Sequence, residues 1–161
     1  MSDGDVIAPL DLDVVMARIT QLCPSFASVQ EAITALVAAE SGDFRSPGAF
    51  VLEPAESPLG SPNGSGGSLV QRVMVEIGIL TGVTNMRDPT ASASAPTMRK
   101  ARGELRQAML GWVPFADDQG RPLSTDFVLG ASRPFGFRDS TYWFLDSFRC
   151  ERLLSGRRAI G

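Results

Sequence analysis

The segment "VQRVMVEIGILTGV", residues 70–83, decides the fold class, because apolar side chains occupy every second position along most of its length. Successive residues of a strand point to opposite faces, so this alternation predicts a strand of an antiparallel sheet with one buried face. The side chains expected on that face are Gln71, Val73, Val75, Ile77, Ile79, Thr81 and Val83. At about 3.3 Å per residue the strand would reach roughly 46 Å. We therefore expect it either to bend at Gly78 or to project beyond the core.

Three shorter segments also have the composition of strands. Residues 48–54, "GAFVLEP", form a short apolar run that ends at a proline. Residues 127–132, "FVLGAS", and 140–148, "STYWFLDSF", follow a polar turn, and the second of them is aromatic and alternating. Trp143 and Phe144 must point to opposite faces of their strand. One of them is expected to be buried and the other to be covered by a helix or a neighbouring molecule.

Two segments have the three- and four-residue spacing of amphipathic helices. Residues 10–22 have Asp11 and Asp13 in the expected first turn, where their charges favour a helix N-terminus. Residues 91–114 have Pro96 near the first turn and a stop at Gly111. The apolar stripe of this helix is Met98, Ala101, Leu105, Ala108, Met109 and Trp112. The stripe predicts that Trp112 packs into the core.

A further helix is expected between residues 28 and 42. Ser28 is the predicted N-cap, and Glu31, three residues later, would complete a capping box. Gly42 would end the helix. Its expected apolar face is Ile33, Leu36 and Val37.

The order of these elements predicts an α+β fold, with one antiparallel sheet of about four strands packed against helices in a single domain. The domain is expected to span residues 1–154, and residues 155–161 would form a short basic C-terminal tail. Residues 55–68, "AESPLGSPNGSGGS", lie between two of the predicted strands. Ten of these fourteen positions are Gly, Ser or Pro. We expect a long flexible loop there, since such connections tend to be binding elements or disorder.

Composition excludes several classes of protein. The chain has 161 residues, 43% of them hydrophobic, and no apolar run long enough for a membrane helix. It has no histidine, which removes the commonest general base and every histidine-metal site. Cys23 and Cys150 lack metal-binding spacing and are expected to be small buried hydrophobes. No cofactor or metal is expected, and an acidic pI near 4.9 argues against a dedicated nucleic-acid binder.

The carboxylate pairs offer no acid/base chemistry. Asp11 and Asp13 have the place of helix-terminus charges, and Asp117 and Asp118 that of turn residues. The Gly-rich residues 60–67 lack the lysine and the strand-to-helix context of a phosphate-binding loop. We expect no catalytic residue in this chain.

Charge is distributed unevenly along the sequence. Residues 1–90 contain eleven acidic and four basic side chains, whereas residues 91–161 contain seven acidic and eleven basic ones. If the two halves lay on separate surfaces, the basic side of one copy would attract the acidic side of the next, as in rings and filaments. If the halves interleave in space, the asymmetry cancels. The sequence leaves both arrangements open.

An ordered series of motifs resembles the tail terminator-like proteins of long-tailed bacteriophages. The series runs from about residue 12 to 150 and comprises "AFVL", a polar excursion, "VQRVMVEIGILTGVTNMRD", "LGWVP", "LGAS" and "YWFLDSF". The resemblance implies a homohexameric ring on the last ring of the tail tube, at the head-tail junction of the virion. Such a ring stops tube polymerisation and attaches the neck or head-completion (stopper) protein. DNA would pass through it without specific recognition, along a channel lined by acidic or small polar residues.

The resemblance suggests where copies and partners meet. A loop that becomes ordered only on contact suits staged assembly, so the loop is expected at a subunit or ring contact, against the alternative of a tolerated surface insertion. Arg99, Arg102 and Arg106 form a second stripe beside the apolar one, which is either a solvated face or a subunit contact. The candidate contact residues are Leu59, Asn63, Ser65, Arg72, Arg87, Asp88, Arg99, Arg102 and Arg106.

Two other interpretations remain. The chain could be another neck, head-tail completion or tail tube protein of similar fold. It could instead be a small soluble enzyme, although the missing histidines and the absence of catalytic motifs argue against this. For a virion protein, assembly would take place in the host cytoplasm, and no membrane is expected to be involved. A discrete ring in solution would favour a virion protein, and a monomer would favour an enzyme.

Overall fold

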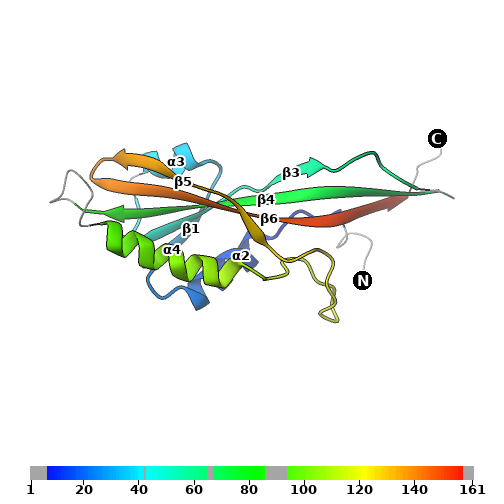
Figure 1. Ribbon diagram of the computed structural model, residues 1–161, viewed down its shortest axis with the longest axis horizontal. Coiled ribbons are helices and arrows are strands. Elements are labelled where there is room, and N and C mark those ends of the chain that lie inside the picture. Colours follow the sequence, from blue (N-terminus) through cyan, green and yellow to red (C-terminus); the bar gives the residue numbers. More distant parts are fainter. Residues whose placement is uncertain (1–6, 42, 65–66, 86–93, 158–161) are drawn as a thin grey trace.

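The computed structural model describes residues 7–41, 43–64, 67–85 and 94–157, which form one α+β domain (Figure 1). Its helices are α2 (Leu12–Leu22), α3 (Ala35–Ser41) and α4 (Ala95–Met109). Its strands are β1 (Ser28–Ala32), β2 (Gly48–Leu52), β3 (Ala55–Pro58), β4 (Ser68–Thr84), β5 (Val128–Arg138) and β6 (Thr141–Arg157). The α+β class expected from the sequence is confirmed.

The described strands form one open mixed sheet, which corrects the expectation of about four antiparallel strands. Along the sheet the order is β1-β2-β4-β6-β5, and β3 pairs with β4 off this path. Strand β1 runs parallel to β2, whereas every other pair is antiparallel. The two unexpected strands are β1 and β3. Strand β3 occupies the first four residues of the segment that the sequence predicted as a loop.

The helix predicted from Ser28 is wrong at its start, because Ser28–Ala32 is strand β1. The Ser28 hydroxyl donates to the Arg45 carbonyl at 2.7 Å and accepts from the Arg45 amide at 3.2 Å, so it does not cap a helix. Thr34 takes that role, since its hydroxyl accepts the Val37 amide at 3.2 Å. Pairing with β2 therefore outweighed the local capping signal.

The apolar residues of that predicted helix are also placed differently. Ala38 and Ala39 are the buried side chains of α3. The sequence placed Ile33, Leu36 and Val37 on the buried face of the helix. Their exposed fractions are 76%, 48% and 52%, respectively.

The strand predicted at residues 70–83 is confirmed and extended, since β4 contains 17 residues. It pairs with β6 in an unbroken antiparallel register from Ser68 opposite Arg157 to Thr84 opposite Thr141. Gly78 pairs with Ser147 within that register, so the glycine does not interrupt the ladder. Strand β6 includes the first three residues of the segment predicted as a tail.

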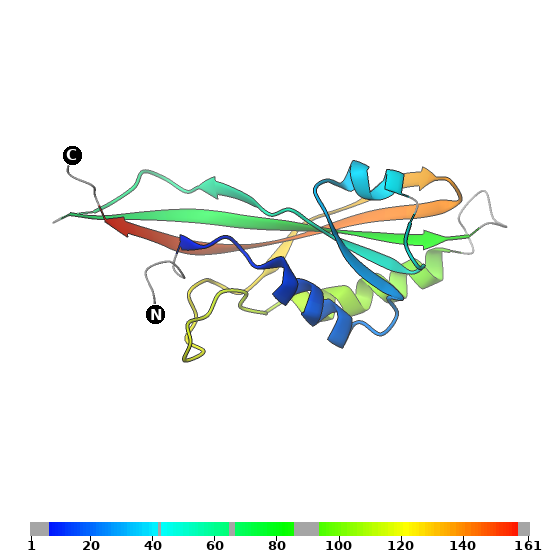
Figure 2. The ribbon, with the colours of Figure 1, turned by 180° about the vertical axis from the view of Figure 1, so that it is seen from behind.

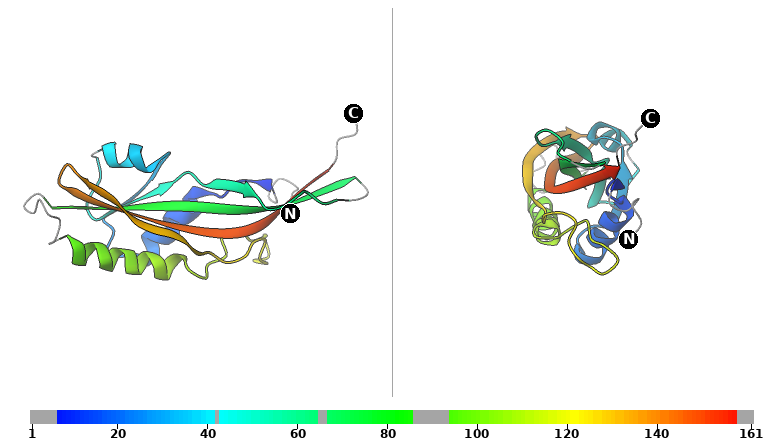
Figure 3. Two further views of the ribbon diagram at one scale, coloured as in Figure 1. Left: turned by 45° about the horizontal axis from the view of Figure 1, so that its top comes forward. Right: turned by 90° about the vertical axis from the view of Figure 1, so that its right-hand side faces the viewer.

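The β4–β6 pair projects from the helix-covered part of the molecule (Figures 1 and 3). Of the two outcomes expected for the long strand, projection is the one observed. We call residues 68–72 of β4 and 153–157 of β6 the distal ribbon, and the helix-covered remainder the body. Residues 59–64 run beside the ribbon, where the Leu59 amide donates to the Arg72 carbonyl at 2.9 Å.

One face of the sheet is covered by α2 and α4 (Figure 2). The expected alternation of β4 is confirmed there, because Val75, Ile77 and Ile79 are fully buried on this face. The predicted helices are confirmed as well, and Asp11 is the N-cap of α2, accepting the Asp13 amide at 2.9 Å. Cys23 and Cys150 are buried free thiols on this side, as expected.

The other face is covered in part by α3. A second apolar cluster there joins Phe50, Leu80 and Trp143 to the alanines of α3. A Cβ atom at Gly82 would lie 2.5 Å from the Trp143 ring, so glycine is required for this close approach. Trp143 is 1% exposed, while Phe144 on the opposite face is half-buried. The expectation for these two aromatic residues is confirmed.

The end of α4 is fixed by a turn. Gly111 has φ +77°, a left-handed conformation that favours glycine, and the chain leaves the helical path there. Trp112 then packs against the core, with its ring centroid 5.7 Å from that of Phe127. The Arg18 guanidinium lies 4.8 Å from the Trp112 ring centroid and covers its outer side.

Candidate functional site

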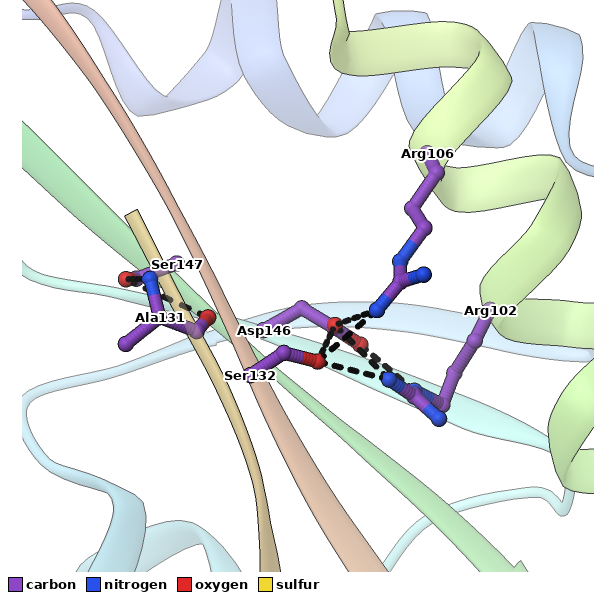
Figure 4. Close-up of polar contacts among 6 residues, drawn as sticks. All are labelled: Arg102, Arg106, Ala131, Ser132, Asp146 and Ser147. Atoms are coloured by element: carbon purple, nitrogen blue, oxygen red, sulfur yellow. Dashed lines mark hydrogen bonds and ion pairs between the residues drawn. The ribbon is translucent and has the colours of Figure 1, made fainter. Parts of the chain in front are cut away.

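A fully buried carboxylate lies where α4 crosses strand β6 (Figure 4). Asp146 accepts two hydrogen bonds from Arg102, at 2.7 Å from Nε and 3.0 Å from Nη2. Arg106, one helical turn later, donates from Nη2 to the same carboxylate at 3.3 Å. The spacing of the two arginines along α4 brings both side chains to one side of the helix. The arginine stripe read from the sequence is therefore used, in part, inside the subunit.

Ser132 of strand β5 completes this network. Its hydroxyl donates to Oδ1 of Asp146 at 2.5 Å and accepts from Nη2 of Arg102 at 2.7 Å and of Arg106 at 2.9 Å. Three elements, α4, β5 and β6, thus meet at one carboxylate. We call these four residues the Asp146 cluster.

A bulge in β5 places Ser132 in this position. The register with β6 shifts between Leu129 and Ser132, and the Ala131 amide donates to Oγ of Ser147 at 2.8 Å (Figure 4). A Cβ atom at Gly130 would lie 2.7 Å from that Oγ, so the backbone approach requires glycine. Asp146 and Ser147 therefore hold two neighbouring residues of the bulge, Ser132 and Ala131, from opposite faces of β6. Bulges of this kind re-aim side chains near functional surfaces.

The electrostatics of the Asp146 cluster favour the ionised acid. Burial by itself would raise the pKa of Asp146, but hydrogen bonds from Arg102 and Ser132 and the charges of both arginines lower it below its usual value. The carboxylate is thus a fixed anion with all its partners in place. Because it faces two guanidinium groups, the cluster retains one excess positive charge, and the Arg106 side chain that carries part of it is 39% exposed.

The aromatic ring beside the cluster strengthens it. The Arg102 guanidinium carbon lies 3.3 Å from the Phe144 ring centroid, a stacking arrangement favourable for this cation. Phe144 is the residue that the sequence expected to be covered by a helix or a neighbour. The cover is Arg102 of α4.

The distal ribbon is the second notable surface. Leu69 and Leu153 are 38% and 52% exposed there, and no described side chain of the ribbon is fully buried. Arg72 and Glu151 form an ion pair at 2.7 Å across its base, with both side chains exposed. A hollow of about 660 Å³ lies beside this pair, lined on one side by Pro122 and neighbouring loop residues.

The predicted contact residues fall into three groups. Leu59, Asn63 and Arg72 lie in or beside the distal ribbon, where Asn63 and Val70 exchange two backbone hydrogen bonds of 2.8 and 2.6 Å. Arg99 is exposed on α4. Arg102 and Arg106 belong to the Asp146 cluster. Ser65, Arg87 and Asp88 lie outside the described residues.

Sequence reasoning missed Asp146 and Ser132. A signal was present, because Asp146 is the single acidic residue in the otherwise aromatic and apolar strand "YWFLDSF". Its position in the alternation places it on the same face as Phe144 and Phe148, which is the face toward the arginine stripe. A carboxylate that faces into the protein needs a cation as its partner.

Among the residues that the structure describes, the remaining polar groups show no reactive arrangement. Burial raises the pKa of the Cys23 and Cys150 thiols to about 11, which keeps both protonated and unreactive near neutral pH. The predicted Asp117–Asp118 turn is confirmed, since the Asp117 carboxylate accepts the Gln119 and Arg121 amides. Within the described ranges no cluster of metal-ligating side chains occurs. No helix there is long and apolar enough to span a membrane.

The fold and these surfaces define an α+β protein whose buried polar groups hold strands and helices together and whose long strand pair is left exposed. The family model for phage tail terminator proteins matches residues 6–157, almost the whole chain. The chain therefore belongs to the phage tail terminator family, a family of structural proteins of the phage tail. A search of curated proteins found no match.

Proposed function

We propose that this chain forms a ring of identical subunits, generally six, on the last ring of the tail tube. The ring stops further addition of tube protein and presents its other side to the stopper protein of the neck. Membership of the tail terminator family supports this function. Its partners are other copies of the chain, the tail tube protein and the stopper protein, in the virion and earlier in the host cytoplasm.

The distal ribbon is the observation that carries this proposal. Leu69 on one face of the strand pair and Leu153 on the other are exposed, while Leu154 packs against the edge of the core. A strand pair without a covering layer is marginal by itself in water, and exposed apolar side chains on it are typical of a contact surface. The ribbon is therefore suited to lie against another protein in the assembled tail. The predicted contacts Leu59, Asn63 and Arg72 lie along it.

A capping experiment tests the function. Purified tail tube protein is allowed to polymerise with increasing amounts of this chain, and tube lengths are measured by electron microscopy. Capping predicts that tubes become shorter at ratios far below one chain per tube subunit, because only tube ends bind the ring. Unchanged tube lengths would contradict the proposal. Tubes formed by this chain alone would instead identify it as a tube subunit.

A pair of variants tests the part played by the ribbon. Leu153→Asp should abolish capping because it places a charge in the proposed contact, while leaving the fold intact. Leu22→Asp is the matched control, since Leu22 is a similarly exposed leucine, 44% against 52%, on helix α2 of the body. If Leu153→Asp shortens the tubes as strongly as Leu22→Asp and the unmodified chain do, the ribbon is excluded as the tube-binding element.

A further inference from the structure

The two outer strands of the sheet belong to parts of the molecule with opposite charge. The strand order nearly follows the chain order, so the asymmetry seen in the sequence is preserved in space. Residues 10–58 contain seven acidic and two basic side chains, a net charge of −5. Helix α4 and strand β5 together contain one acidic and six basic side chains, a net charge of +5. In end view, β5 and α4 lie on one side and α2 on the other (Figure 3).

The side of the sheet that ends in β1 carries exposed acidic and apolar groups. Glu31 on β1 and Asp43 are both exposed, and Ile33 between them in sequence is 76% exposed. A hollow of about 460 Å³ lies beside the strand, lined by Asp43, by exposed Arg45 and by β1 residues including Gln30. Ile33 lines a different hollow, on the α3 face of the sheet, so we call only Glu31 and Asp43 the acidic edge.

The side that ends in β5 has the opposite character. Arg99 of α4 is exposed, and Arg106 on the same side of that helix adds the excess positive charge of the Asp146 cluster. Arg133 of β5 is also exposed, but it faces the α3 side of the sheet, where it lines a hollow with Ile33 and Glu53. Val128 and Leu129, 50% and 37% exposed, supply apolar surface beside the arginines. We call the three arginines, Val128 and Leu129 the basic edge. One ion pair, Arg138 to Glu40 at 3.6 Å, links the two sides within a single chain at the end of the β5–β6 hairpin.

Strand β5 is poorly suited to extend the sheet through backbone hydrogen bonds. It contains two register shifts, next to Gly130 and Gly136, and between them Pro134, which has no amide hydrogen to donate. Bulges, proline and charged side chains are the means by which edge strands avoid pairing with other strands. A contact at this edge must therefore rely on side chains.

We propose that neighbouring copies meet with the acidic edge of one against the basic edge of the next. This inference rests on the proposed ring and names the surfaces that join its subunits. Each chain carries both members of a complementary pair on different sides, which is the requirement for a head-to-tail contact that closes into a ring. A second copy is the occupant that satisfies both edges at once, since DNA would leave the acidic edge uncovered.

Paired charge reversals test the contact. The acidic-edge variant Glu31→Arg with Asp43→Arg has two basic edges, and the basic-edge variant Arg99→Glu with Arg133→Glu has two acidic edges. Neither variant should assemble alone, with association at least about tenfold weaker than for the unmodified chain. Their mixture should assemble again, because copies that alternate around a ring place opposite charges at every contact. Native mass spectrometry and sedimentation velocity measure the assemblies.

Matched controls use exposed charges elsewhere. Lys100→Glu lies next to Arg99 in the helix but shares its side with Glu104, which faces away from β5 and accepts the Ser25 amide at 3.0 Å. Asp118→Arg lies in the turn that ends at Gly120. Both controls should assemble as the unmodified chain does. Assembly of the unmodified chain should also weaken as salt is added, because exposed charge pairs are screened.

The outcomes separate this contact from the proposed function. Normal assembly of either reversed variant alone, or failure of the folded variants to assemble when mixed, would overturn the contact while leaving a ring possible. A mixture that forms rings but does not cap tail tubes would support the contact and contradict the function. If the unmodified chain forms no ring alone or on tube ends, both are wrong.

Discussion

The body and the distal ribbon are built from the same two strands, yet their surroundings are opposite. Within the body, Ile77 of β4 lies opposite Phe148 of β6, and both side chains are completely buried. In the ribbon, Leu69 and Leu153 of the same strands are exposed. The hydrogen-bonded register is continuous through both regions. The difference shows that the alternation of a strand specifies a face, whereas helices elsewhere in the chain decide whether that face is covered.

The body and the ribbon therefore have different roles, the first in stability and the second in contact with other molecules. Burial of apolar side chains contributes roughly 25 cal/mol per Å² removed from water, so the body provides most of the folding free energy. The ribbon adds little burial and is held in place by continuity with the body. Its exposed leucines are available for contact with another molecule. Changes in the body should therefore alter stability, and changes in the ribbon should alter assembly.

The largest effect on the body is expected from Asp146→Ala. This change leaves Arg102 and Arg106 without the carboxylate that binds both, and breaking a buried ion pair from one side costs about 3–5 kcal/mol of unfolding free energy. Chemical denaturation measures the loss. Asp118→Ala, at an exposed turn position, is the control and should change stability by less than about 0.5 kcal/mol. A loss below about 1 kcal/mol in Asp146→Ala would show that the cluster does not stabilise the body.

A smaller and sharper contrast is expected between two leucines. Leu105→Ala removes a fully buried side chain under the sheet and should cost about 2–4 kcal/mol, through lost burial and the cavity that remains. Leu153→Ala in the ribbon should cost less than about 0.5 kcal/mol in the isolated subunit. Denaturant midpoints of the two variants measure the difference. Similar losses in both would mean that the ribbon contributes to the core and would contradict the division into two regions.

The sequence predicted the long elements because their periodicity is intrinsic. Strand β4 and helix α4 each show a continuous apolar pattern, and the structure confirms both. Strands β1 and β3 contain only 5 and 4 residues, and all four residues of β3 are exposed, so no buried pattern was available to detect. Their strand conformation comes from pairing with β2 and β4. Such elements follow from tertiary neighbours and not from local composition.

The Asp146 cluster was predictable only in part. The arginine stripe of α4 was visible, as was an acidic residue within an aromatic strand. Their meeting depends on how α4 crosses the sheet, and 44 residues separate Arg102 from Asp146. The bulge that presents Ser132 depends on a close approach of Gly130 to Ser147, which no local pattern specifies. The preserved charge asymmetry follows likewise from the strand order.

The smallest effect expected in the body is a dependence of stability on pH. The folded-state pKa of Asp146 is lowered, so its contribution to stability is fully present above the unfolded pKa of about 3.9 and is lost as pH falls through the lower folded value. The stability difference between the unmodified chain and Asp146→Asn should therefore be constant from about pH 7 to pH 5 and shrink below about pH 4. Thermal unfolding across this range measures it. A difference that stays constant down to pH about 2 would indicate that the Asp146 carboxylate remains ionised throughout and is held more strongly than a single paired acid. A difference that shrinks already near pH 6 would show a raised pKa, and burial would then outweigh the two arginines.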